Sequence, residues 1–130
     1  MNIKIAINIL LGLLAAVILF HLTIIFKVIP YNIAWGGRLQ SDSEMYVFET
    51  ISILINLFLA LILLMKGGYI KSVINRKIID IILWAFVVIF ILNTIGNIFA
   101  KTILEKSFAI LTLGSAILIW GILRKKKLTH

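Results

Sequence analysis

Four long apolar blocks, separated by short polar connections, constrain this chain more than any other feature. The blocks run over about residues 5–27, 43–65, 78–100 and 107–123, and the last connection spans about 101–106. Each block has about the 20 residues that a helix needs to cross roughly 30 Å of hydrocarbon. Hydrophobic residues make up 62% of the 130 residues, against about 45–50% in soluble domains. The sequence therefore predicts a single-domain, all-α integral membrane four-helix bundle.

The connections contain signals that end and start helices. Pro30 is predicted to end the first helical region, since it lacks a backbone N–H. The SDSE run at 41–44 predicts a capping box, in which Ser41 accepts from the Glu44 N–H and Glu44 accepts from the Ser41 N–H. The KGG run at 66–68 predicts the end of the second span. The first block is long for a secretory signal and no A-x-A-like site follows it, so we expect it to be retained.

Lys and Arg residues are distributed unevenly over the two sides that alternating spans would create. One side holds Lys4, Lys66, Lys71, Arg76, Lys77 and the basic run at 124–127. The other side holds only Lys27, Arg38, Lys101 and Lys106. Because the side richer in Lys and Arg faces the cytoplasm, we predict a multi-pass protein of the inner (plasma) membrane with both termini cytoplasmic.

The formal net charge is +8, which by itself would fit a nucleic-acid-binding protein. The charges lie between the apolar blocks and at the C-terminus, which is the pattern of residues that contact lipid headgroups. We therefore expect the partners to be the lipid bilayer, with anionic lipid headgroups at the basic C-terminus, and no nucleic acid. The absence of cysteine excludes disulfides and thiolate metal sites.

Polar residues inside the apolar blocks are the candidate functional residues, because each costs free energy in hydrocarbon unless it has a partner. Glu49, Ser52 and Asn56 share one helix face at spacings i, i+3 and i+7. Nearly all such residues fall in the outer half of the bilayer, and only Asn8 and Asp80 lie toward the cytoplasm. This asymmetry predicts a polar, outward-opening cleft over a closed apolar inner half. The candidate ligand-binding residues are Glu49, Arg38, Trp35, His21, Ser52, Asn56, Asn93 and Asn97.

Glu49 is the most informative of these residues because it is ionisable. It lies about two turns into the second span, where a carboxylate that faced lipid would be costly. We therefore expect Glu49 to point into the bundle, toward Arg38 or toward Asn97 and Lys101. An acid–base pair with His21 is a further option, although no nucleophile accompanies it.

No catalytic motif occurs in the sequence. It contains no H-E-x-x-H, no G-x-S-x-G, no P-loop and no dinucleotide fingerprint. The two histidines, His21 and His130, fall on opposite sides of the membrane in the predicted topology, so they cannot share a metal. We expect no catalytic residue, no bound metal, no cofactor and no enzymatic activity.

Several sequence blocks resemble those of small uncharacterised bacterial four-span membrane proteins. These blocks are WGGRL at 35–39, DSEMYVFE at 42–49, NTIGN at 93–97 and FAILT at 108–112. The resemblance covers most of the chain. It implies a bacterial four-span membrane protein and brings no activity with it.

Two functions stay open at this point. In the first, which we favour, the polar residues are contacts between helices of an accessory or structural protein that binds another membrane protein or a second copy of itself. In the second, the chain is a transporter, channel or receptor-like protein with a small polar or ionic ligand in the cleft. Glu49 would then be the charged contact and Arg38 a gate or counter-ion, with a hydrogen-bonding wall formed by Asn56, Asn93 and Asn97.

Overall fold

The computed structural model describes residues 2–31 and 39–125. Four helices make up most of this part: α1 (Ile3–Ile25), α2 (Asp42–Lys66), α3 (Arg76–Ile98) and α4 (Ile103–Lys125). All four are long and apolar enough to cross a membrane, and the described residues contain no strand. The prediction of an all-α chain with four long apolar helices is confirmed.

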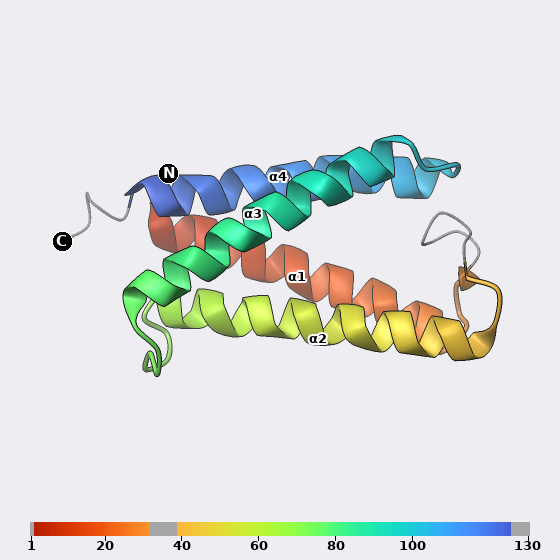
Figure 1. Ribbon diagram of the computed structural model, residues 1–130, viewed down its shortest axis with the longest axis horizontal. Helices are drawn as coiled ribbons and strands as arrows, with labels where there is room; N and C mark the ends of the chain where they lie inside the picture. Colours follow the sequence, from red (N-terminus) through yellow and green to blue (C-terminus); the bar gives the residue numbers. More distant parts are fainter. Residues whose placement is uncertain (1, 32–38, 126–130) are drawn as a thin grey trace.

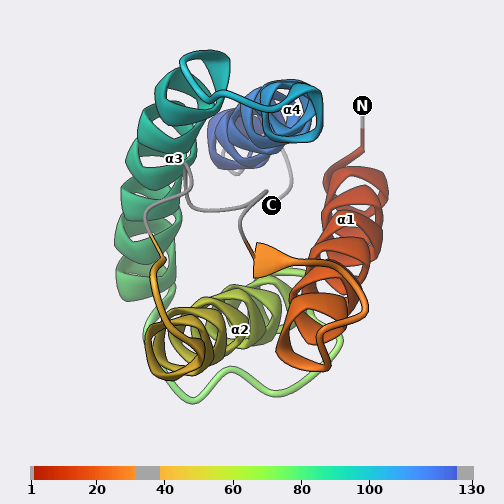
Figure 2. The same ribbon diagram turned by 90° about the vertical axis from the view of Figure 1, so that its right-hand side faces the viewer.

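The helices run alternately up and down (Figure 1). The start of α1, the connection from α2 to α3 and the end of α4 lie together at one end, which we call the basic end after its exposed residues Lys4, Lys71, Arg76, Lys77 and Arg124. Packing is most extensive between α3 and α4 and, among successive helices, least extensive between α2 and α3. Helix α3 leaves α2 at the basic end and crosses toward the start of α4 (Figures 1 and 2). The helices α2 and α3 therefore diverge toward the opposite end.

The main hydrophobic core lies in the half of the bundle nearer the basic end. All four helices contribute fully buried side chains to it, including Ile7, Leu10, Leu59, Leu63, Leu83, Ile119 and Ile122. A smaller buried cluster at the opposite end contains Ile24, Leu39 and Met45. The closed apolar half that the sequence predicted on the basic side agrees with this core.

Helix α2 begins at the predicted cap, with one change in the reciprocal bond. The Ser41 Oγ accepts from the Glu44 N–H at 3.1 Å, as expected. The Glu44 Oε1 accepts from the N–H of Gln40 at 2.9 Å, one residue before the predicted donor. Asp42 and Glu44 both lie in the first turn, where negative charge is favoured by the helix dipole.

Two helices end in a Schellman motif, in which a residue of positive φ follows the last turn. In α1 this residue is Lys27, with φ 61°, and the next N–H, of Val28, donates to the Thr23 carbonyl at 2.8 Å. The helix ends at Ile25, so these bonds end it before Pro30 is reached. In α2 the corresponding residue is Gly68, with φ 76°, which agrees with the predicted stop at 66–68.

Helix α4 begins at Ile103, four residues before the predicted span, because the Thr102 hydroxyl caps its first turn. The Thr102 Oγ1 accepts from the Glu105 N–H at 3.2 Å and donates to the Glu105 carboxylate at 2.9 Å. The T-x-x-E pattern at 102–105 is the same signal that located the start of α2. The structure thus corrects the interpretation of this whole stretch as a connection.

Candidate functional site

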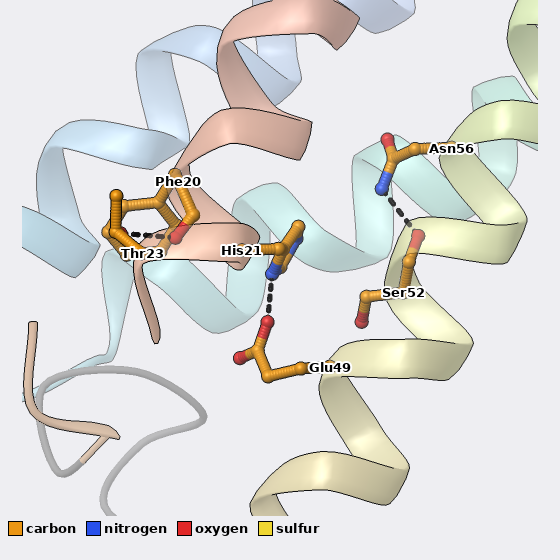
Figure 3. Close-up of polar contacts among 6 residues, drawn as sticks. All are labelled: Phe20, His21, Thr23, Glu49, Ser52 and Asn56. Carbon is orange, nitrogen blue, oxygen red and sulfur yellow. Dashed lines mark hydrogen bonds and ion pairs between the residues drawn. The ribbon is translucent and has the colours of Figure 1, made fainter. Parts of the chain in front are cut away.

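The candidate site is a pair of ionisable side chains between α1 and α2, in the half of the bundle away from the basic end. The Nδ1 of His21 donates to the Oε2 of Glu49 (Figure 3). The Glu49 side chain is fully buried, and that of His21 is 15% exposed. The pair therefore links two antiparallel helices through a hydrogen bond in surroundings that contain little water.

Local structure places both residues at similar depth. His21 lies one turn before the end of α1 at Ile25, and Glu49 lies about two turns inside the Ser41 cap of α2. Edge-to-face packing of the His21 and Phe20 rings, with centroids 5.9 Å apart, adds to the orientation of the imidazole. Phe20 in turn packs edge-to-face on Phe108 of α4, with centroids 4.9 Å apart.

The prediction that Glu49 points into the bundle is confirmed, and its described ion-pair partner is His21. The sequence predicted Arg38, or Asn97 and Lys101, as the partners. Arg38 and the candidate ligand-binding residue Trp35 lie outside the described residues. The structure places Lys101 on the exposed surface and leaves Asn97 partly exposed.

Ser52 and Asn56 continue the Glu49 face of α2 toward the middle of the bundle. The Asn56 Nδ2 donates to the Ser52 backbone carbonyl at 2.7 Å (Figure 3). Both residues are partly exposed, although their face of α2 includes the buried residues Met45 and Leu63. The amide of Asn56 is thus engaged within its own helix, one to two turns from the His21–Glu49 pair.

The polar contact between α3 and α4 is made by two threonines that were not among the candidate ligand-binding residues. The hydroxyls of Thr94 and Thr112 lie 2.8 Å apart, and both residues are buried. Asn93 is exposed, so the structure does not bring it to the Glu49 face through a buried contact. Thr94 was missed because Asn93 and Asn97 are more polar. The signal available in the sequence was that Thr94 follows the apolar residue Phe90 by four positions, which places both on one helix face.

A second buried ion pair joins α2 to α3 at the basic end. The Nζ of Lys66 lies 2.8 Å from the Oδ1 of Asp80, with the two side chains 3% and 7% exposed. By contrast, the Lys27–Asp42 pair at the opposite end is about half exposed on both sides. The hydrogen bond with Asp42, followed by the charge of that carboxylate, raises the pKa of Lys27.

The described residues contain no group of three or more His, Cys, Asp or Glu side chains that could hold a metal ion. The site itself consists of a buried carboxyl group and an imidazole that share a hydrogen bond. Comparison with protein-family models, curated proteins and solved structures found no match. Inference about function consequently depends on the residues themselves.

Proposed function

We propose that this chain is a non-enzymatic accessory or structural membrane protein that binds another membrane protein or a second copy of itself. We place it in the inner (plasma) membrane of a bacterium, with both termini cytoplasmic and the basic C-terminal run on anionic lipid headgroups. The proposal is carried by one observation, which is that polar side chains link each successive pair of helices.

These links are the His21–Glu49 contact for α1 and α2, the Lys66–Asp80 contact for α2 and α3, and the Thr94–Thr112 contact for α3 and α4. In lipid there is little hydrophobic drive between helices, so polar contacts and close packing set their arrangement. Polar groups that are engaged within the bundle support a scaffold role better than a role in ligand transport.

The outward faces of the four helices are apolar and exposed, and a partner protein would meet the bundle there. Each helix offers a large exposed side chain for a test: Leu19 at 62%, Leu54 at 60%, Leu92 at 61% and Ile110 at 79%. A photoreactive amino acid placed at each position in turn, in native membranes, would report what lies against each face.

We expect a discrete protein adduct from one or two of these faces, at a mass that is the same in repeated preparations. The remaining faces serve as controls and should yield lipid adducts. Lipid adducts alone from all four positions would refute the interaction role.

A specific observation favours the ligand-binding alternative as a second candidate. The His21–Glu49 pair lies in the half of the bundle where α2 and α3 diverge, beside the partly exposed Ser52 and Asn56. A transporter, channel or receptor-like protein would use Glu49 as the charged contact for a small polar or ionic ligand. The variant that replaces both His21 and Glu49 by leucine separates the two functions. A scaffold keeps its partner adduct in this variant, whereas a ligand-binding protein stays folded and loses ligand binding.

A further inference from the structure

Among residues 2–31 and 39–125, the basic end presents exposed positive charge without an exposed carboxylate. Lys4, Lys71, Arg76, Lys77 and Arg124 are all exposed. Among residues 2–31 and 39–125, Asp80 is the one carboxylate on this side, and it is buried against Lys66. The Lys66–Asp80 pair neutralises its own charge, so the described residues of this end carry an excess of exposed positive charge.

The positions of Lys4, Arg76 and Lys77 run against the electrostatics of the helices that contain them. Helices α1 and α3 start at the basic end with no acidic residue in the first turn, and their first turns contain Lys4, Arg76 and Lys77 instead. A helix N-terminus carries partial positive charge and favours anions. Helices α2 and α4, which start at the opposite end, follow this preference with Asp42 and Glu105 in their first turns. Lys4, Arg76 and Lys77 are therefore placed against the helix dipoles, which indicates a negative partner outside the protein.

Aromatic rings hold two of these cations at the edge of the apolar surface. The Lys4 ammonium lies 5.3 Å from the centroid of the Tyr69 ring, and the Tyr69 hydroxyl donates to the Asn8 side chain at 2.7 Å. The Arg124 guanidinium lies 4.5 Å from the centroid of the Trp120 ring. Half-exposed Tyr and Trp rings beside Lys and Arg are typical of the headgroup region of a bilayer.

We propose that the basic end is a binding surface for anionic phospholipid headgroups, formed jointly by the starts of α1 and α3, the 67–75 connection and the end of α4. This surface extends beyond the basic C-terminal run, because Lys4, Lys71, Arg76 and Lys77 belong to other segments. The inference rests on the proposed membrane location and is independent of the accessory role. Lipid phosphates meet the cations, and the Tyr69 and Trp120 rings lie at the level of the headgroups.

The test compares two matched double variants of the full chain. Lys71→Gln/Lys77→Gln removes two exposed lysines from the basic end, and Lys101→Gln/Lys106→Gln removes two exposed lysines from the opposite end. Each purified protein is equilibrated with an equimolar mixture of phosphatidylglycerol and phosphatidylcholine in detergent micelles. Native mass spectrometry then gives the ratio of the two lipids that stay bound.

A cation close to an anionic lipid surface contributes roughly a fivefold change in binding. We therefore expect the wild-type protein to prefer phosphatidylglycerol, and Lys71→Gln/Lys77→Gln to lower this preference by roughly 25-fold. The control variant Lys101→Gln/Lys106→Gln should change this lipid preference by less than about twofold, because the carboxylates Asp42, Glu44 and Glu105 lie at the same end of the bundle as the two lysines. The wild-type preference should also weaken as salt rises.

Equal effects of the two double variants, or the absence of any preference for phosphatidylglycerol, would overturn the proposal. Tighter binding of a short DNA duplex than of phosphatidylglycerol, measured on protein in phosphatidylcholine nanodiscs, would also overturn it by assigning the surface to nucleic acid. Extraction of the protein from vesicles by alkaline wash is measured in parallel. Release by that wash would contradict the membrane location itself, whereas retention without lipid preference would contradict this inference alone.

Discussion

Removing one partner of the buried His21–Glu49 pair should be more damaging than removing both. The three variants are His21→Leu, Glu49→Leu and the double variant, with leucine chosen to fill a similar volume. The two side chains are 15% and 0% exposed, so a single substitution leaves the remaining polar group with little access to water. Together with the wild-type protein, the three variants form a double-mutant cycle. This cycle isolates the coupling energy between His21 and Glu49, because each single variant removes their hydrogen bond by itself.

The expected magnitudes differ between the two single variants. His21→Leu removes the hydrogen-bond partner of a fully buried carboxylate, and removing one partner of a buried pair in this way costs about 3–5 kcal/mol. Glu49→Leu leaves a partly exposed imidazole that can be neutral, and a buried polar group that loses its partner costs about 1–3 kcal/mol. The double variant should lie within about 1 kcal/mol of the wild-type stability, since apolar replacement of a whole buried ion pair is often neutral or stabilising.

The free energy of unfolding can be measured by titration with sodium dodecyl sulfate in mixed micelles, with helix content as the readout. Glu49→Gln provides a further comparison, because its amide oxygen still accepts from the His21 Nδ1 while the charge is gone. It should lose less stability than Glu49→Leu. Asn93→Leu, at an exposed position of α3, serves as the control and should not destabilise the protein. A coupling energy below about 0.6 kcal/mol, the average for hydrogen bonds between membrane helices, would refute the reasoning.

Five other substitutions test local features of the fold and topology. Ser41→Ala removes the α2 cap and should lower the free energy of unfolding by about 1 kcal/mol. Hydrogen exchange should show that α2 still begins at the same residue. Gly68→Ala should cost about 1 kcal/mol or more, since φ is 76° there. Thr94→Val removes the buried hydroxyl link to α4 and should lower stability by roughly 0.6–1.7 kcal/mol. Cysteines introduced at Gln40 and Ser72 should label from opposite sides of intact cells, Gln40 from outside; labelling of the Ser72 position alone by an impermeant reagent would contradict the topology.

The helices and their starts were predictable from the sequence because both depend on local physics. Apolar length identified four helices, and the S-x-x-E pattern located the start of α2 at the observed cap. The same local rule would have located the start of α4 from Thr102 and Glu105. The end of α1 was harder to predict from the sequence, because Lys27 adopts a positive φ that glycine favours and lysine rarely adopts.

The pairing of Glu49 with His21 was only partly predictable. Helical periodicity gives the face of Glu49, which is why its inward direction could be inferred. Its partner depends on the relative heights of α1 and α2, which the connection and the packing set together. His21 and Glu49 are separated by 28 positions, and several polar residues near the ends of other spans were equally plausible from spacing alone. Thr94 shows the same limit, because its partner Thr112 lies on a different helix.

The two buried pairs, Lys66–Asp80 and His21–Glu49, lie in parts of the bundle that are packed to different extents. Lys66–Asp80 lies at the basic end, in the half of the bundle where the main core packs all four helices together. His21–Glu49 lies in the other half, near the small cluster around Ile24, where α2 and α3 diverge. Local opening takes place where buried apolar contacts are fewest. If one pair of successive helices in this bundle separates when a ligand or partner binds, it should be α2 and α3, whose packing is the least extensive, with the basic-end half remaining as the fixed base.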